Sequence, residues 1–306
     1  MPDAEEPRVL LFGGSGQLGS ALARTFSGAA LEAHDRHSCN LLDEGALRRT
    51  LRRSKPRIVI NAAAYTNVDR AETERDICLA ANARAPEIMA KEAAAIGARF
   101  IHYSTDYVFD GKKTTPYTET DAPHPLNVYG ESKLLGETSA LKENAQTTVF
   151  RLSWVYGFEG HNFPRTILDL AEKQDRVEVV DDQFGAPTFA GHVARVTKAC
   201  IAQMMENPQQ PQWCGLFHLA PGGSTSWHDY ACFIVRHAEQ YGLRLRLNGN
   251  NIIPVASTSR TSRAARPGYS IFDTSKLSRV FGIKLPMWDS DLKMFLDEFL
   301  TGRPHD

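Results

Sequence analysis

The chain lacks an excess of charge of either sign. Its 306 residues carry 35 Lys and Arg against 36 Asp and Glu, a formal net charge of −1. Such a protein has no broad electrostatic attraction to nucleic acid or to anionic lipid. No stretch approaches the roughly 20 apolar residues of a membrane-spanning helix, and the acidic start MPDAEEPR does not resemble a secretory signal peptide. We therefore expect no nucleic-acid partner and no membrane.

Cysteine is also scarce, and the pattern CxxC is absent. The five cysteines are odd in number and scattered along the chain: Cys39, Cys78, Cys200, Cys214 and Cys232. This usage is typical of a reduced compartment and offers no zinc site, so we expect a cytoplasmic protein. With 42% hydrophobic and 23% charged residues, the composition argues against disorder.

The first half of the chain alternates short apolar runs with helix-like segments. The predicted strands are RVLLF, IVINA, RFIHYS and TVFRL, at 8–12, 58–62, 99–104 and 148–152. Predicted helices cover 17–26 and an Ala-rich stretch, 71–97, that ends at a glycine. Strands that alternate with helices predict βαβ units, and therefore an α/β fold of the Rossmann type with a doubly wound parallel sheet.

The alternation weakens after about residue 154, where proline and glycine accumulate. Short strands are predicted at 177–180 and 216–219, and helices at 228–241 and 288–300. At this length two folding units are expected. We predict a nucleotide-binding Rossmann domain at 1–155, to which the chain returns near 189–220, and a smaller α/β substrate lobe at 156–306. Five arginines between 48 and 57 are interpreted as a solvated helix face.

A glycine-rich turn, GGSGQLG, follows the first predicted strand and opens a helix. Gly13, Gly16 and Gly19 stand at the spacing GxxGxxG. A pyrophosphate needs a tight turn, a close approach of backbone and the free N–H groups of a helix N-terminus. A glycine triplet alone is a weak signal, but its place between strand and helix favours dinucleotide binding.

The residues after the run 29–33 give opposite indications about the cofactor. Asp35 lies about 20 positions beyond the glycine turn, where an acidic residue binds the adenosine ribose of NAD. Its neighbour Arg36 suits the 2′-phosphate of NADP. The choice between NADPH and NADH stays open at this point.

Tyr129 and Lys133 stand four residues apart in LNVYGESKLLGE, on one face of a predicted helix. Carbonyl reduction needs a proton donor, and an ammonium group beside a phenol stabilises the phenolate and lowers its pKa. Ser104 and Thr105 end the preceding strand at the sheet edge where ligands bind. Because strand neighbours point to opposite faces, we prefer Thr105 as the catalytic hydroxyl.

Together these motifs resemble the extended short-chain dehydrogenase/reductases, and within them the dTDP-4-dehydrorhamnose reductase family. The segments that carry the resemblance span nearly the whole chain: 61–72 (NAAAYTNVDRAE), 101–111 (IHYSTDYVFDG), 125–137 (PLNVYGESKLLGE), 150–157 (FRLSWVYG), 181–188 (DDQFGAPT) and Arg266-Pro267. The resemblance implies hydride transfer from NADPH or NADH to the C4 ketone of dTDP-4-dehydro-β-L-rhamnose, giving dTDP-L-rhamnose.

The resemblance also implies roles for single residues. Tyr129 would donate the proton, Lys133 would lower the Tyr129 pKa and hold the nicotinamide ribose, and Thr105 would orient the carbonyl. The other implied cofactor contacts are Gly13, Gly16, Gln17, Leu18, Gly19, Asp35, Arg36, Asn40, Leu41, Ala62, Ala63 and Ala64. The implied substrate contacts are Val68, Asp106, Tyr107, Trp154 and Arg266. A buried core tryptophan is an equal interpretation of Trp154.

Some members of this family bind magnesium at a dimer interface through carboxylates. The segment FAGHV after GAPT lacks the glutamate that this would need, so we expect no essential metal. A homodimer is compatible with the resemblance, but the residues do not decide the oligomeric state.

Two other functions fit parts of the pattern. The regulatory β subunit of methionine adenosyltransferase has this fold without catalysis, but here Thr105, Tyr129 and Lys133 are all present. A dehydratase or epimerase of another nucleotide sugar is the second alternative. Dehydratases add acidic residues beside the catalytic hydroxyl, whereas Asp106 is followed here by Tyr107.

Overall fold

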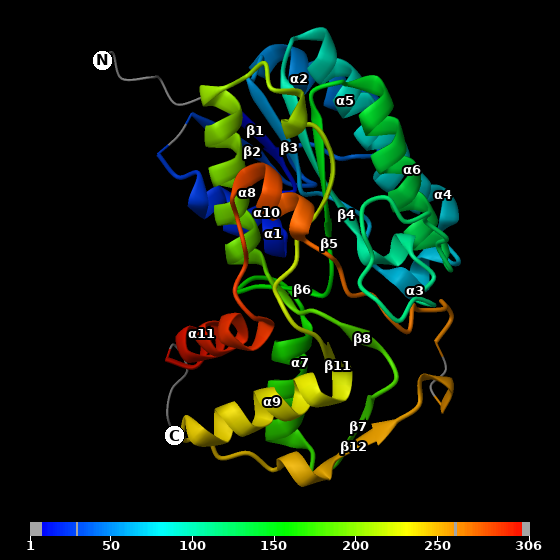
Figure 1. Ribbon diagram of the computed structural model, residues 1–306, viewed down its shortest axis with the longest axis vertical. Coiled ribbons are helices and arrows are strands. Elements are labelled where there is room, and N and C mark those ends of the chain that lie inside the picture. Colours follow the sequence, from blue (N-terminus) through cyan, green and yellow to red (C-terminus); the bar gives the residue numbers. More distant parts are fainter. Residues whose placement is uncertain (1–7, 29, 260–261, 302–306) are drawn as a thin grey trace.

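Six parallel strands form the central sheet of the first lobe, in the upper half of Figure 1. The computed structural model describes residues 8–28, 30–259 and 262–301. The strand order is β10-β5-β4-β3-β1-β2, and every neighbouring pair is parallel. The strands are β1 (Val9–Phe12), β2 (Leu31–His34), β3 (Ile58–Asn61), β4 (Arg99–Thr105), β5 (Thr147–Leu152) and β10 (Gly215–His218). The predicted doubly wound α/β fold is confirmed.

Helices cover both faces of this sheet, which is why its inner strands are apolar on both sides. Every residue of β1, β3, β4 and β5 is buried. One face packs against α1 (Gln17–Thr25), α8 (Ala190–Glu206) and α10 (Ser275–Phe281). The other face packs against α2 (Glu44–Ser54), α5 (Ala85–Ala95) and α6 (Val128–Glu143). Because helices occupy both faces, the carboxyl edge of the sheet is the side that remains to face the second lobe.

The continuous helix predicted for 71–97 is wrong. The chain forms α3 (Val68–Ala71), a turn, α4 (Arg75–Leu79), a π-helical segment (Ala80–Arg84) and then α5. The π segment carries Asn82, which is 1% exposed and whose side chain hydrogen-bonds to Tyr65. Its carbonyl lies so close to Gly136 of α6 that a Cβ on Gly136 would be 2.0 Å away. These buried contacts override the regular helical hydrogen bonding, as is common at functional sites.

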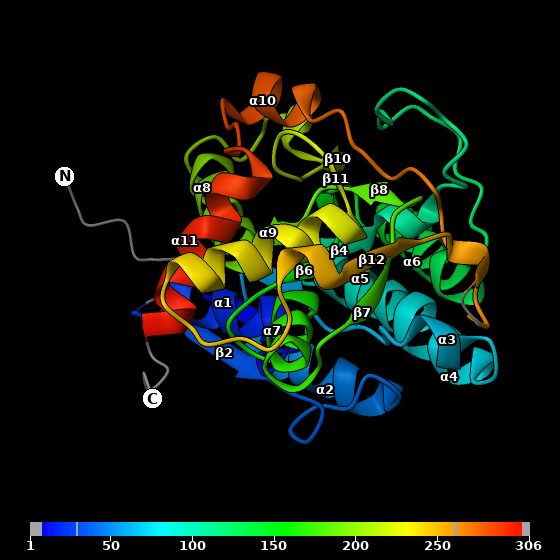
Figure 2. The same cartoon turned by 90° about the horizontal axis from the view of Figure 1, so that it is seen from below.

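The second lobe has its own apolar core below the sheet (Figures 1 and 2). It contains α7 (Phe163–Lys173), α9 (Trp227–Gln240) and α11 (Trp288–Thr301), with β7 (Val177–Val180) paired in parallel to β12 (Ile252–Val255). Shorter strands are β6 (Val155–Tyr156) with β9 (Thr188–Phe189), and β8 (Phe184–Gly185) with β11 (Thr225–Ser226). The division at residue 155 stays a prediction, while α8 and β10 lie with the first lobe.

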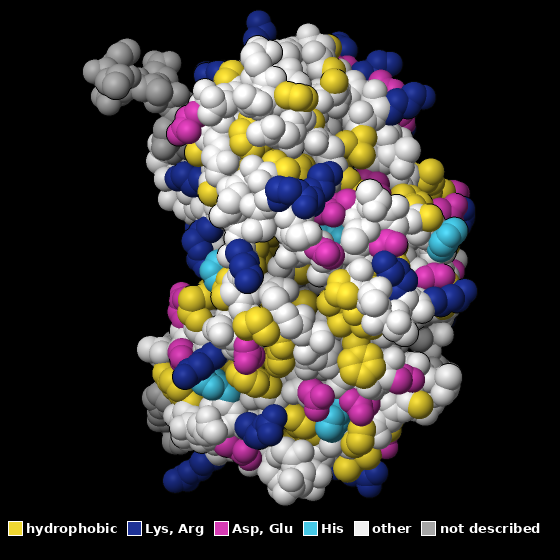
Figure 3. Space-filling model, in the orientation of Figure 1, with side chains coloured by type: hydrophobic (Ala, Val, Ile, Leu, Met, Phe, Trp, Pro, Cys, Tyr) yellow, Lys and Arg dark blue, Asp and Glu magenta, His cyan; other side chains and the backbone are white. Residues whose placement is uncertain are grey.

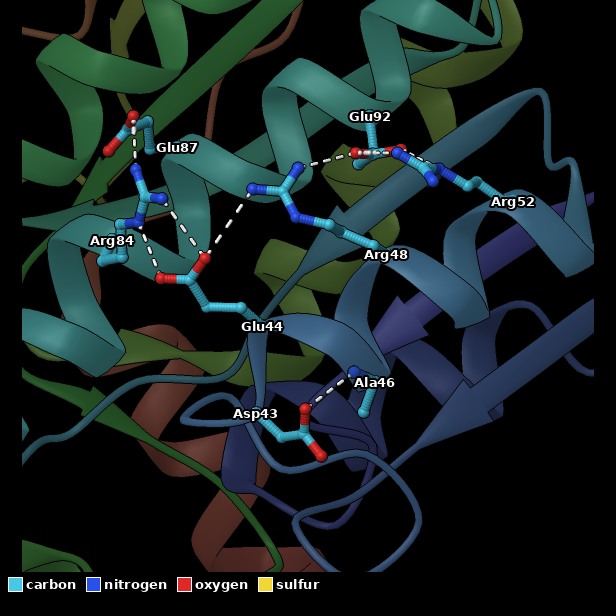
Figure 4. A network of polar contacts seen from close by, with 8 residues as sticks. All are labelled: Asp43, Glu44, Ala46, Arg48, Arg52, Arg84, Glu87 and Glu92. Atoms are coloured by element: carbon cyan, nitrogen blue, oxygen red, sulfur yellow. Dashed lines mark hydrogen bonds and ion pairs between the residues drawn. The ribbon is translucent and has the colours of Figure 1, made fainter.

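Two arginines of α2, Arg48 and Arg52, form ion pairs with an acidic side chain of α5 (Figure 4). Arg48 and Arg52 both donate to Glu92 of α5, at 2.7 Å, and Glu44 pairs with Arg84. The bond from Arg52 is the main reason that the pKa of the Glu92 carboxyl is lowered. These pairs attach α2 to its neighbouring helix. Lysine, arginine and acidic side chains are interspersed over the face in Figure 3, so no field of one sign covers it.

Among the described helices, none has the length and apolar character required to cross a membrane.

Candidate active site

The glycine turn places backbone where only glycine fits. Gly13 has φ +86°, and a Cβ there would lie 2.6 Å from the Ala63 nitrogen. A Cβ on Gly19 would lie 1.8 Å from the carbonyl oxygen of Gly13. Gly16 is the N-cap residue of α1 and makes no side-chain cap, so the first N–H groups of the helix remain for a ligand. A turn with free N–H groups at a helix N-terminus is the kind of site that binds phosphate groups.

The two residues that follow Gly16 are oriented differently. Leu18 is buried in the core beneath the sheet. Gln17 extends to the second lobe, where its amide donates to the His161 carbonyl and its Oε1 accepts from Asn162, both at 3.2 Å. The Gln17 side chain thus joins the phosphate turn to the loop before α7, a contact that the sequence did not indicate.

The loop 62–64 is half-buried and held from two sides. Asn61 at the end of β3 accepts a hydrogen bond from the Ala63 N–H at 3.1 Å. Asn82 donates to the Tyr65 carbonyl at 2.9 Å and to the Ser132 hydroxyl of α6 at 3.0 Å. Sequence reasoning did not single out Asn82. A lone asparagine within an Ala-rich helical stretch is the pattern that could have indicated it.

The turn after β2 contains the residues expected at the adenosine. Asp35 accepts hydrogen bonds from the N–H groups of His37 and Ser38 and from the Ser38 hydroxyl, at 2.9 to 3.0 Å. These bonds, those to Ser38 foremost, lower its pKa. Arg36 and Asn40 are exposed, and Leu41 is half-buried. The Asp35 carboxylate is therefore engaged by its own turn, while Arg36 is accessible.

Thr105 and Tyr129 meet at the end of β4. The Thr105 hydroxyl donates to Asp106 Oδ1 at 3.0 Å and accepts from the Tyr107 N–H at 3.2 Å, and it lies near enough to Tyr129 to lower the pKa of that phenol. Asp106 is 2% exposed, and its burial, partly offset by bonds to Ser270 and Thr105, raises its pKa to about 6. The Ser104 hydroxyl is buried and makes no hydrogen bond within the described residues.

Lys133 lies one helical turn after Tyr129 on α6, and its side chain reaches β4. Its ammonium donates to the Tyr103 carbonyl at 2.6 Å, and the residue is 3% exposed. Burial lowers its pKa to about 8, against the opposing charge of Glu137. Burial also raises the pKa of Tyr129, and the nearby Thr105 hydroxyl only partly offsets this. The lowering of the Tyr129 pKa by Lys133 does not occur in this state and stays a proposal for the loaded enzyme.

The expected substrate residues form two groups. Tyr107 packs edge-on against Tyr129, with ring centroids 5.5 Å apart, and burial raises its pKa, which the positive charge of the nearby Arg266 acts to lower. Arg266 also donates to Asp69 of α3 at 2.8 Å, beside the half-buried Val68. Tyr107, Arg266, Asp69 and Val68 therefore lie together on one side of Tyr129.

Trp154 stands apart from that group in a strained backbone conformation. Its φ is +45°, which non-glycine residues rarely adopt and which is often found at functional sites. One face of the indole stacks on Trp227, with centroids 3.6 Å apart, and a Cβ on Gly185 would lie 2.4 Å from the ring. Trp154 is half-buried, so both the core and the substrate interpretation remain.

A pocket of about 770 Å³ opens beside these residues in the second lobe. Its wall combines apolar side chains of α7 and β7 with Gln183, Trp227, Ser257 and the segment 262–266, which includes Arg266. The volume and the mixed lining suit a nucleotide-sized ligand. The described residues contain no group of three or more His, Cys, Asp or Glu that could hold a metal ion.

Comparison with known proteins identifies the family. The family model described as the RmlD substrate binding domain matches residues 7–301. A dTDP-4-dehydrorhamnose reductase of Shigella flexneri is 41% identical over 298 residues, which are 96% of this chain and 98% of that protein. Among solved structures, the dTDP-4-dehydrorhamnose reductase of Clostridium acetobutylicum has a TM-score of 0.86 and 31% identity, covering 95% of this chain and 98% of that one.

The dTDP-4-dehydrorhamnose reductase of Bacillus anthracis, solved in complex with NADP, also has a TM-score of 0.86 and 31% identity, covering 96% of this chain and 99% of that chain. The resemblance expected from the motifs is confirmed by these similarities. Over nearly its whole length, the chain belongs to the RmlD substrate binding domain family, that of the dTDP-4-dehydrorhamnose reductases.

Proposed function

We propose that this chain is an NAD(P)H-dependent reductase that converts dTDP-4-dehydro-β-L-rhamnose to dTDP-L-rhamnose. The observation that carries the proposal is the meeting of Tyr129 with Thr105 at the end of β4, with Lys133 over the same strand. The glycine turn follows β1 and Thr105 ends β4 in the same parallel sheet, and the chain is similar over its length to reductases of this name.

The bound nicotinamide would supply hydride to the C4 carbonyl. In this chain the turn of Gly13, Gly16 and Gly19 would hold the pyrophosphate, with the N–H groups of Gln17 and Leu18 at the start of α1. The loop 62–64 would line the same cleft, and Arg36 would bind the 2′-phosphate of NADPH. Asn40 and Leu41 would lie at the adenine.

Tyr129 would give its hydroxyl proton to O4 as the carbonyl becomes an alcohol. Thr105 already contacts Tyr129, so its hydroxyl would stand beside the same oxygen. Lys133 is buried with one ammonium proton on Tyr103 and two others left for a ribose or for the phenolate. A positive charge there would stabilise the phenolate left after proton transfer.

The substrate would enter from the pocket of the second lobe. Arg266 lines that pocket and would bind the diphosphate, since a guanidinium matches phosphate oxygens in a bidentate geometry. Tyr107, Asp106 and Val68 would surround the sugar near Tyr129. Trp154 would contribute an apolar edge to the deoxysugar.

The direct test follows nicotinamide absorbance while dTDP-4-dehydro-β-L-rhamnose is generated in situ, with NADPH and NADH in parallel. Oxidation with formation of dTDP-L-rhamnose is the expected result. Tyr129→Phe should keep cofactor binding and lose most turnover, because it removes one hydroxyl and little volume. Tight NADPH binding by the wild-type chain without turnover would instead favour another sugar or a regulatory binding role.

A cytoplasmic location and a homodimer are further predictions. Cell fractionation tests the first. Light scattering tests the second, since a dimer has twice the 34.0 kDa mass of the chain.

A further inference from the structure

Three segments meet beside Tyr129: the helix α3, the N-terminus of α6, and the stretch 262–266, which we name the wall segment because it lines the pocket. Asp69 of α3 holds this segment most extensively. Its Oδ1 accepts from the Ser262 hydroxyl at 2.9 Å and from the N–H groups of Arg263 and Ala264 at 3.2 and 3.1 Å. Its Oδ2 accepts from Arg266. The Asp69 carboxylate thus fixes both the backbone of the wall segment and the guanidinium of Arg266.

Asn127 holds the same segment from the other side. Its Nδ2 donates to the Ala265 carbonyl at 2.7 Å, and its Oδ1 accepts from the Gly130 N–H at 2.8 Å. A carbonyl can only accept and an N–H can only donate, so these two partners fix the orientation of the amide. Asn127 is 8% exposed, and it is the N-cap residue of α6.

The first turn of α6 is anchored to the same junction by two further contacts. Glu72, directly after α3, accepts from the Val128 N–H at 2.9 Å. Gly130 lies so close to the Tyr107 carbonyl that a Cβ there would be 2.2 Å away. The turn that carries Tyr129 is therefore rigidly placed relative to α3 and to Tyr107.

Arg266 is the side chain through which this junction reaches the substrate. It lines the pocket, donates to Asp69 and lies beside Tyr107, whose ring packs on Tyr129. Burial opposes ionisation of Asp69, but its bonds to Ala264, Arg266 and Ser262 outweigh this and lower its pKa. Asp69 is therefore an anionic partner that orients Arg266.

We propose that Asn127 is a positioning residue for the nucleotide-sugar substrate: by holding the Ala265 carbonyl it seats Arg266 at the diphosphate while it caps the helix that carries Tyr129. The proposal rests on the proposed function and names a residue that acts through Arg266 rather than on the reacting atoms. Asp69 is the second anchor of the same wall segment.

The substitution Asn127→Asp separates the two contacts. Asp is as good an N-cap as Asn, so the bond to Gly130 and the helix are retained, but the donor to Ala265 is lost. We expect KM for the nucleotide sugar to rise about five- to tenfold, as for loss of one hydrogen bond. The turnover number and the dissociation constant of NADPH should stay within about twofold of wild type.

Asn127→Ser provides the second variant, because serine also caps α6 but is too short to reach Ala265 and adds no charge. It should show the same rise in KM. Asn248→Asp is the matched control: Asn248 caps a short exposed turn by accepting from the Asn250 N–H at 3.0 Å, and it does not line the pocket. Its KM should equal that of wild type.

Asp69→Asn tests whether both anchors act through one segment. The rise in KM for the double variant Asp69→Asn/Asn127→Asp should be smaller than the product of the single rises. Each residue can position Arg266 only while the other still holds the wall segment. An unchanged KM in both Asn127 variants, or a rise matched by equal losses in turnover and NADPH binding, would overturn the proposal. An inactive wild-type enzyme would instead overturn the proposed function.

Discussion

The ammonium group of Lys133 donates a hydrogen bond of 2.6 Å to the Tyr103 carbonyl in the sheet of the first lobe. The residue is 3% exposed, and burial lowers its pKa from 10.5 to about 8, against the opposing charge of Glu137. A charge buried in this way destabilises the folded chain, because water solvates an ammonium better than one carbonyl does. The folded chain therefore buries the Lys133 ammonium at a cost in stability.

Lys133→Met should raise the free energy of unfolding at pH 7 while turnover is lost. Below pH 8 the lysine is protonated in both states, so its full penalty is present. Between pH 8 and 10.5 the folded state binds fewer protons than the unfolded state, and wild-type stability recovers as pH rises. The advantage of the variant should thus shrink between urea titrations at pH 7 and pH 10. Lys142→Met, at an exposed site on the same helix, is the control; an advantage of Lys133→Met that does not change with pH would contradict the assignment.

Arg36→Ala should weaken NADPH binding about tenfold and leave NADH binding nearly unchanged. The reason is local: Asp35 is occupied by hydrogen bonds of its own turn, whereas the adjacent Arg36 is exposed. Fluorescence titration with each nucleotide measures both constants. Arg57→Ala, another exposed arginine of the first lobe, should change neither. Equal weakening of the two cofactors by Arg36→Ala would show that Arg36 does not bind the 2′-phosphate.

The central strands and the positions of Thr105, Tyr129 and Lys133 in the fold were predictable because short-range patterns encode them. β4 ends at Thr105, next to the predicted end, and the four-residue spacing of Tyr129 and Lys133 brings both to that strand. Parallel strands share one carboxyl edge, so motifs that follow successive strands converge there.

The junction around the wall segment was not predictable in the same way. Asp69 and Arg266 are 197 residues apart and lie on a short helix and an irregular segment, neither of which has a periodic pattern. The π segment at Asn82 was not predicted for a related reason. An Ala-rich sequence favours an uninterrupted helix, and the interruption depends on buried side-chain contacts with distant parts of the fold.

Gly19→Ala should weaken NADPH binding by about ten- to a hundredfold. A methyl group there would lie 1.8 Å from the Gly13 oxygen, so the phosphate turn must move before the helix can pack on it. Quenching of tryptophan fluorescence by NADPH reports the constant. Gly249→Ala is the control, since a Cβ at Gly249 meets nothing closer than 3.7 Å. Wild-type affinity in Gly19→Ala would show that the turn does not contact the pyrophosphate.

Glu137 and Arg151 form an ion pair beneath the active site, with side chains only 4% and 3% exposed. Glu137 Oε2 accepts from Arg151 Nε at 3.1 Å, and the guanidinium lies 4.9 Å from the centre of the Phe109 ring. Arg151 Nη1 is buried and has no hydrogen-bond partner among the described residues. The carboxylate is therefore the principal compensation for a charge that water does not reach.

Glu137→Gln should lower the free energy of unfolding by about 3–5 kcal/mol, because it leaves a buried guanidinium without its counter-charge. Glu137→Gln/Arg151→Met removes both charges and should recover most of that loss. Urea titration measures the free energy of unfolding of both variants. The control is Glu44→Gln, which removes an exposed ion pair with Arg84 and should lower that free energy far less. If the single variant were as stable as wild type, Arg151 would have to find another partner in the folded chain. A double variant less stable than the single one would show instead that the guanidinium stabilises the sheet through Phe109.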